Sequence, residues 1–284
     1  MSGLKALVIQ GGSLRSIFTA GVLDSFIAAK FDPFDIYIGV SGGSMCMSYY
    51  LTQQYKATYD ILSNIFSDPK FISLKQLFAT EGYVNLQYLE EYAKKRNPLN
   101  LEKANEKANN GCVEVVATNM EDGEPVYIRP NLNTWHQAMR ASSTLPFLTK
   151  GYCMFNDMKL MDGGWSDPIP VKRAVELGAE KIVVIRTLPA ERKLDWSYFG
   201  WFGGIWHRDN PALSRRFSED HVYYNDSIDY IAENPDKVEI IQIAPEENLA
   251  TGSYNTSGSK INQDYRLGMH LGLDFLQNHG QTFL

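Results

Sequence analysis

The segment Gly39-Val40-Ser41-Gly42-Gly43 decides the fold, because it joins an apolar run over residues 35–40 to a helical pattern. It matches G-x-S-x-G, the pattern of a tight strand-to-helix turn that holds a serine hydroxyl clear of the sheet at a helix N-terminus. Gly39 and Gly43 supply the small neighbours that such a turn requires. The alternative is an ordinary turn with a capping serine. The strand and the helix on its two sides favour Ser41 as a nucleophile.

The same strand, glycine and helix order occurs earlier in the chain, where an apolar run over residues 4–10 precedes Gly11-Gly12 and a helical pattern over residues 17–29. Strands that alternate with helices predict right-handed crossovers. We therefore expect an α/β fold with a mainly parallel central sheet covered by helices on both faces, as one domain over residues 1–284.

The remaining elements follow from periodicity and turn residues. We expect helices within 56–109, a strand at 112–118 with a hairpin partner at 126–128, a helix at 134–143, a hairpin at 152–161 turning at Asn156-Asp157, a helix at 171–177, a strand at 181–186, a helix across 214–232, a strand at 238–243, a polar loop at 246–259 and a terminal helix.

Composition limits the class of partner. The 284 residues carry a net charge of −6, which disfavours nucleic acid. Three scattered cysteines, Cys46, Cys112 and Cys153, indicate neither a disulfide framework nor a zinc site. The N-terminus lacks a signal-peptide pattern and no apolar stretch is long enough to cross a bilayer, so we expect a cytoplasmic protein with at most peripheral membrane contact. We expect no metal or cofactor, and the oligomeric state stays open.

A candidate base is Asp162, which ends an apolar strand and precedes Gly163-Gly164. Burial beside apolar walls would raise its pKa and make it a better base for a serine, although an aspartate before glycine is also common in plain turns. The late histidines offer a second type of base, but none lies in a loop motif typical of catalysis, so a structural role is favoured for His207, His221, His270 and His279.

Residues 10–16, Gln-Gly-Gly-Ser-Leu-Arg-Ser, form a glycine loop that runs into a helix N-terminus. Such a loop exposes backbone N–H groups to an anion, as an oxyanion hole requires. It lacks the Gly-Lys-Ser/Thr of a phosphate-binding Walker loop, and Ser16 breaks G-x-G-x-x-G. An ordinary tight turn is the alternative.

These three elements together resemble the patatin-like phospholipase family, whose pattern is G-G-G-x-R/K-G, G-x-S-x-G and D-G-G or D-G-A. Residues 141–147 and 167–171 are also similar to that family, and the likeness covers residues 4 to about 187. The resemblance implies a patatin-like three-layer sandwich and hydrolysis of phospholipid or other acyl esters by a Ser-Asp dyad. It assigns Ser41 and Asp162 as catalytic, the amides of Gly11, Gly12 and Ser13 as the oxyanion hole, and supporting roles to Arg15, Gly39, Gly43, Gly163 and Gly164.

The chain departs from the family pattern at Ser13 and Ser16, which stand where glycines are usual. If the backbone at residue 13 needs positive φ, serine is strained there and the amide is aimed differently. The second hypothesis is therefore a lipid- or acyl-binding pseudoenzyme with an impaired oxyanion loop. A phosphate-ligand binder is a weaker third.

Residues 195–206 hold three of the five tryptophans. Within 188–213 they predict either a mobile aromatic lid or a membrane-dipping loop, with Arg192, Lys193 and Arg208 near anionic head groups. The alternative is a loop packed on the core or on a dimer surface. Residues 246–284 are interpreted as a C-terminal extension of the domain.

Overall fold

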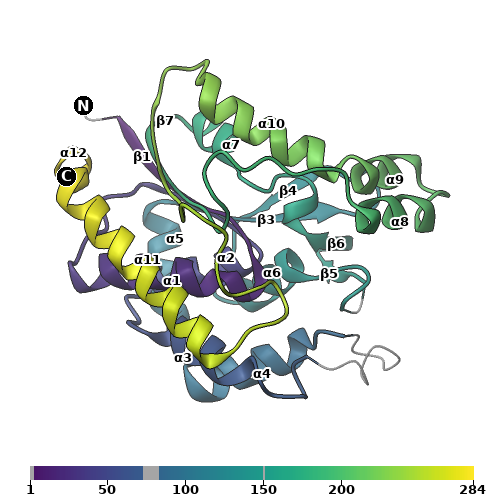
Figure 1. Ribbon diagram of the computed structural model, residues 1–284, viewed down its shortest axis with the longest axis horizontal. Helices are drawn as coiled ribbons and strands as arrows, with labels where there is room; N and C mark the ends of the chain where they lie inside the picture. Colours follow the sequence, from purple (N-terminus) through teal and green to yellow (C-terminus); the bar gives the residue numbers. More distant parts are fainter. Residues whose placement is uncertain (1–2, 73–82, 150) are drawn as a thin grey trace.

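The computed structural model describes residues 3–72, 83–149 and 151–284. In that part of the chain the strands form one sheet in the order β5-β6-β3-β2-β1-β7-β8, and β4 pairs with β3 off this path (Figure 1). The strands are β1 (Leu4–Ile9), β2 (Ile36–Val40), β3 (Cys112–Asn119), β4 (Pro125–Ile128), β5 (Cys153–Phe155), β6 (Met158–Asp162), β7 (Ala179–Ile185) and β8 (Glu239–Ile243).

The central five strands are parallel, while β4, β5 and β6 add antiparallel pairs at one side. Ile9 of β1 pairs with Gly39 of β2, so the loops that follow these two strands leave the sheet at the same edge. The prediction of a mainly parallel sheet is confirmed. This edge is where ligands bind in open α/β sheets.

Helices cover both faces of the sheet. One face carries α1 (Ser16–Ala28), α2 (Gly42–Leu51), α3 (Ala57–Ile65), α4 (Leu86–Arg96), α5 (Leu101–Asn110), α6 (Trp135–Ser143), α11 (Gly258–Asn278) and α12 (Gly280–Phe283). The other carries α7 (Val171–Glu176) and α10 (Asp220–Glu233), and the pair α8 (Tyr198–Trp206) and α9 (Pro211–Ser218) projects beyond the end of the sheet (Figure 1). Short 3-10 turns are η1 (Ser13–Arg15) and η3 (Gly163–Trp165).

Alternate residues of each central strand face opposite layers, as the two-residue period of a strand requires. In β1, Leu7 and Ile9 belong to the core under α1 and α2, whereas Ala6 and Val8 belong to the core under α7 and α10. A sheet between two helical layers is the patatin-like sandwich that the motifs implied.

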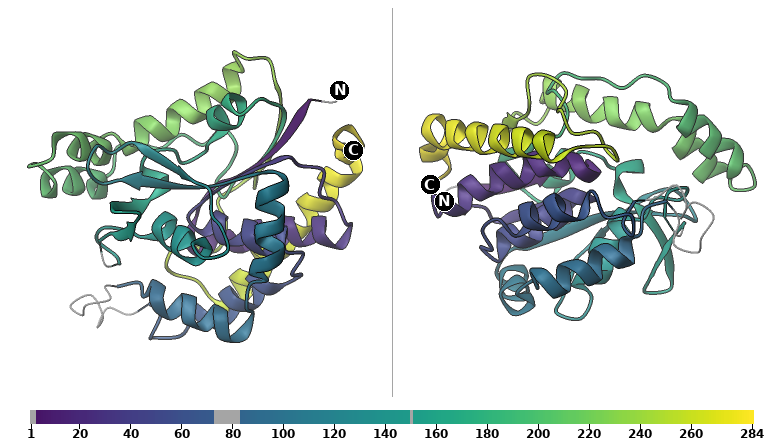
Figure 2. Two further views of the ribbon diagram at one scale, coloured as in Figure 1. Left: turned by 180° about the vertical axis from the view of Figure 1, so that it is seen from behind. Right: turned by 60° about the horizontal axis from the view of Figure 1, so that its bottom comes forward.

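The C-terminal helix α11 packs along α1, and Figure 2 shows the two side by side. Glycines permit this close approach, since a Cβ on Gly268 would lie 2.0 Å from the carbonyl oxygen of Phe18. The interpretation of residues 1–284 as one domain stays a prediction, and this packing supports it.

Two predicted elements are wrong in detail. The helix expected across 214–232 is divided into α9 and α10, because Glu219 leaves the helical region (φ −110°, ψ 20°) and the Asp220 carboxylate accepts a hydrogen bond from the next amide. The aromatic stretch expected as a loop contains helix α8. The hairpin turn at Asn156 and Asp157 is confirmed by positive φ at both residues. Part of the helical prediction for 56–109 falls on 73–82, outside the described residues.

None of the helices in the described ranges is long and apolar enough to cross a membrane.

Candidate active site

Ser41 lies at the turn between β2 and α2 in a strained conformation. Its φ of 52° and ψ of −128° place it in a region that residues with side chains rarely adopt. The turn is tight enough to bring α2 onto β1, since a Cβ on Gly43 would lie 2.7 Å from the carbonyl oxygens of Ile9 and Gln10. A Cβ on Gly39 would lie about as close to the backbone of Ser44. The predicted roles of Gly39 and Gly43 in shaping the turn agree with these contacts.

Asp162 ends β6, in register with Ala117 of β3, and is buried. Its carboxylate accepts hydrogen bonds from the Ser41 hydroxyl and from the Gly164 amide, the latter at 2.8 Å. Burial raises the pKa of Asp162 to about 6, and the two hydrogen bonds act in the opposite direction. Gly163 lies against the backbone of β3. The structure therefore brings together the two side chains that the sequence selected, and gives the carboxylate a pKa suited to a general base.

The glycine loop presents backbone amides without partners. The amides of Gly11, Gly12 and Ser13 donate none of the hydrogen bonds found among the described residues. The next two amides, those of Leu14 and Arg15, donate hydrogen bonds to backbone carbonyls. The three open amides are those predicted for the oxyanion hole, and a Cβ on Gly11 would lie 2.8 Å from the Cβ of Ser41.

Two distant segments hold this loop. The Thr187 hydroxyl, just after β7, donates to the Gly11 carbonyl at 2.7 Å. From the C-terminal polar loop, the Ser253 carbonyl accepts the Leu14 amide at 3.2 Å, and Tyr254 is hydrogen-bonded to the Ser13 side chain. The position of the three open amides therefore depends on contacts far along the chain.

Ser13 has a φ of 51°, so the conformation that would strain a serine is present. Ser16 has an ordinary helical conformation (φ −62°, ψ −6°), and the absence of glycine there causes no backbone strain. Arg15 is held near the loop by a 3.4 Å hydrogen bond from its Nε to the Gly12 carbonyl. Burial lowers the pKa of its guanidinium.

These groups line a cavity of about 240 Å³. Its wall contains Ser41, Asp162, Gly164, Arg15 and the glycine loop, and also Asp220 and Tyr224 from α10. No histidine is among the described residues that line it. His207 follows α8, His221 lies on α10, and the other two late histidines lie on or after α11.

Sequence reasoning missed Ser142, whose Oγ accepts the Ser41 amide at 2.7 Å. It also missed Ser253 and Tyr254, which reach the site from the C-terminal loop, and the fully buried Arg186, which donates to Gln10 at 3.1 Å. Residues 141–147 carry no local signal beyond their similarity to a family segment, and the C-terminal loop carries no local signal of its contacts.

The sheet topology defines an α/β protein, and its candidate site has a serine at a strained strand-to-helix turn beside a buried carboxylate. The model of the family described as patatin-like phospholipase matches residues 7–175. The chain belongs to the patatin-like phospholipase family, a family of lipid acyl hydrolases. A second model, described as a domain of unknown function (DUF6363), matches residues 210–283.

The chain is similar to a known protein in sequence and to a solved structure. The uncharacterized protein YjjU of Escherichia coli strain K12 is 30% identical over 284 residues, which cover 98% of this chain and 79% of that protein. The crystal structure of VipD from Legionella pneumophila is 12% identical with a TM-score of 0.49, covering 98% of this chain and 67% of that one.

Proposed function

We propose that this protein is a serine acyl-ester hydrolase of the phospholipase, lysophospholipase or esterase type, with Ser41 and Asp162 as a catalytic dyad. The observation that carries the proposal is the hydrogen bond from the Ser41 hydroxyl to a buried carboxylate whose pKa is raised to about 6. At pH 7 such a carboxylate is mostly ionised and yet far more basic than an exposed aspartate.

The reaction follows from this geometry. Ser41 Oγ attacks the ester carbonyl while its proton passes to Asp162. The amides of Gly11, Gly12 and Ser13 stabilise the oxyanion, and collapse of the intermediate releases the alcohol, which takes the proton from Asp162. Water, deprotonated by Asp162, then attacks the acyl-enzyme, and collapse of the second intermediate releases the carboxylic acid while Ser41 Oγ takes the proton back from Asp162. Every proton is transferred by one carboxyl group, without histidine.

Labelling with a fluorophosphonate tests the dyad. We expect one adduct on Ser41, located by mass spectrometry, and none in Ser41→Ala protein. Ser253→Ala is a matched control, since it removes a hydroxyl from the same cavity but keeps the carbonyl that accepts the Leu14 amide. Failure of the wild-type protein to label, where a control hydrolase labels, would refute the proposal.

The second candidate is a lipid- or acyl-binding pseudoenzyme. The observation that favours it is the positive φ of Ser13, because strain there can misdirect an amide of the oxyanion loop. Binding of a short-chain ester analogue without labelling or turnover, in protein that unfolds cooperatively, would select this candidate.

We also propose that α8 makes the peripheral membrane contact. Among the described side chains of α8, the large apolar ones are exposed and the glycines face α9, an inversion of the usual arrangement. The exposed residues are Tyr198, Trp201, Phe202, Ile205 and Trp206, and the glycines are Gly200, Gly203 and Gly204. Phe202 and Trp206 pack on Phe147, two residues beyond Leu145 in the cavity wall, so this surface adjoins the site.

A further inference from the structure

The backbone amides of Ser41 and Asp162 are both bonded to one short segment, residues 142–144, at the C-terminal end of α6. The Ser41 amide donates to Ser142 Oγ at 2.7 Å, and the Asp162 amide donates to the Thr144 carbonyl at 2.7 Å. Ser41 follows β2 and Asp162 ends β6, and β3 separates these two strands in the sheet. The 142–144 segment therefore joins two strand ends that do not pair with each other.

The Ser142 hydroxyl takes the place of a strand partner for the Ser41 amide. The parallel pairing of β2 with β3 ends at Val40, opposite Val116. At Ser41 the chain leaves the sheet with a φ of 52°, and its amide donates to a side chain instead of to a strand. A buried amide without a partner is costly, so this bond favours the strained conformation. Ser142 therefore helps to fix the backbone that carries the Ser41 hydroxyl.

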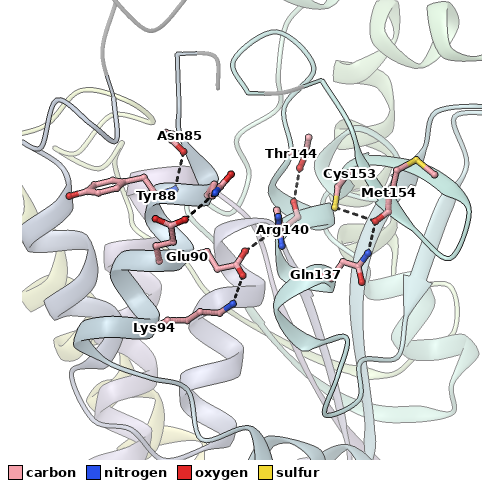
Figure 3. A network of polar contacts seen from close by, with 11 residues as sticks. Asn85, Tyr88, Glu90, Lys94, Gln137, Arg140, Thr144, Cys153 and Met154 are labelled. Carbon is pink, nitrogen blue, oxygen red and sulfur yellow. Dashed lines mark hydrogen bonds and ion pairs between the residues drawn. The ribbon is translucent and has the colours of Figure 1, made fainter. Parts of the chain in front are cut away.

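Helix α6 ends so that the Thr144 carbonyl reaches β6. Pro146 disfavours the helical region for the residue before it, Leu145, so the helix ends ahead of it. Thr144 is already extended (φ −80°, ψ 113°), and its carbonyl accepts the Asp162 amide. Its hydroxyl donates to the Arg140 carbonyl at 2.7 Å, as Figure 3 shows. The conformation that places the carbonyl is thus held by a bond within the last turn.

The helix itself is held on two sides. Arg140 contacts Glu90 of α4 at 3.1 Å, and the Gln137 amide donates to the Met154 carbonyl of β5 at 2.6 Å (Figure 3). These contacts restrict the movement of α6 relative to α4 and the sheet. The segment at its end can therefore hold Ser41 and Asp162 at a constant separation.

We infer that Ser142 and Thr144 are positioning residues, which set the distance between the Ser41 hydroxyl and the Asp162 carboxylate. The inference rests on the proposed function, because it concerns the proton transfer between these two groups. Ser142 is fully buried, so it acts through the backbone of Ser41 and not on the substrate. A displacement of about 1 Å at a reacting group can cost on the order of 100-fold in rate.

Ser142→Ala is the direct test, because it removes the acceptor of the Ser41 amide. On a soluble ester we expect kcat to fall at least about tenfold and KM to change by less than about twofold, since only the reacting geometry is altered. Labelling of Ser41 by a fluorophosphonate should slow by a similar factor. Ser142→Cys keeps a weaker acceptor of similar size and should give an intermediate kcat.

The pH profile distinguishes positioning from a loss of stability. The hydrogen bond from Ser41 lowers the pKa of Asp162, against the larger effect of burial. When Ser142→Ala lets Ser41 move away, this lowering is lost and the pKa of Asp162 rises above about 6. The midpoint of the kcat/KM profile should therefore move to higher pH. A variant that is only less stable keeps the wild-type midpoint.

Ser48→Ala is the matched control. Ser48 on α2 is also fully buried, and its hydroxyl accepts the indole N–H of Trp135 at 2.9 Å. Trp135 is the first residue of α6, about two turns from Ser142, so this bond joins the same two helices away from the dyad. We expect Ser48→Ala to lower the Tm about as much as Ser142→Ala does, and to keep both the wild-type kcat and the wild-type midpoint.

Wild-type kcat and midpoint in Ser142→Ala protein, or an equal loss of kcat in Ser48→Ala protein, overturn the inference while the dyad stands. If Ser142→Ala protein lacks a cooperative unfolding transition, Ser142→Cys is compared with Ser48→Ala in its place.

Wild-type protein that hydrolyses no ester refutes the proposed function instead. The positioning is then measured without turnover, from the carbon-13 chemical shift of the Asp162 carboxyl as the pH is varied. We expect a higher pKa for Asp162 in Ser142→Ala protein than in wild type and Ser48→Ala protein, and equal values in all three overturn the inference.

Discussion

Replacing Asp162 by asparagine should stabilise the fold at neutral pH while it abolishes turnover. The pKa of this carboxyl is raised from 3.8 to about 6 because it is buried, a shift that corresponds to about 3 kcal/mol. The folded state therefore binds the proton more tightly than the unfolded chain does. Consequently the free energy of unfolding falls as the pH rises from about 3.8 to about 6, and the whole cost of the buried charge is present above pH 6.

Asparagine removes the charge and keeps an oxygen that can accept the Gly164 amide. We expect Asp162→Asn protein to gain up to about 3 kcal/mol at pH 7.5, which for a chain of this size raises the Tm by roughly 5–10 °C. Below pH 4 the two proteins should be equally stable. Denaturant titrations of both proteins across pH 4 to 8 measure this difference, and other groups that titrate contribute equally to both proteins.

Asp167 supplies the matched control. It is half-buried, its pKa is likewise raised to about 6 by desolvation, and its carboxylate accepts a hydrogen bond from the Tyr127 hydroxyl at 2.8 Å. Asp167→Asn should show a similar pH-dependent gain in stability but keep its turnover on a soluble ester. A stability difference for Asp162→Asn that is the same at pH 4 and pH 7.5, or a loss of stability at pH 7.5, would refute the assignment of a raised pKa to Asp162.

Three further outcomes are expected. The kcat/KM for a soluble ester should rise with pH to half its maximum near pH 6, because Asp162 must be ionised to accept the proton, and a profile centred below pH 5 would contradict the buried base. Ser13→Gly should raise kcat several-fold at unchanged KM by relieving strain at φ 51°, whereas a lower kcat would show that the Ser13–Tyr254 hydrogen bond aims the amide. Trp201→Ser with Ile205→Ser, in Ser41→Ala protein, should weaken cosedimentation with phosphatidylcholine vesicles at least tenfold, and the exposed Leu273→Ser on α11 should not.

The sequence predicted the parts of the site that local pattern determines. Ser41 and Gly11 each follow a short apolar strand, and parallel pairing of those strands brings their ends together without any distant contact. The hydroxyl of Ser142 was not predicted, because its bond to the Ser41 amide joins residues 101 positions apart. The break at Glu219 was also missed, because apolar periodicity continues through it and no local pattern predicts that Glu219 leaves the helical region.

Three features that lower stability lie at the carboxyl edge of the sheet, and the C-terminal segment supports one of them. Ser41 and Ser13 both hold positive φ, and Asp162 is a buried charge, so each lowers stability by roughly 1–3 kcal/mol. The strain at Ser41 is held by the tight turn between β2 and α2. The strain at Ser13 has no such local support: its side chain is bonded to Tyr254 and the next amide to Ser253, both within the region matched by the second family model. That region therefore supports the glycine loop that we propose as the oxyanion hole, and its removal should lower turnover even if the sheet stays folded.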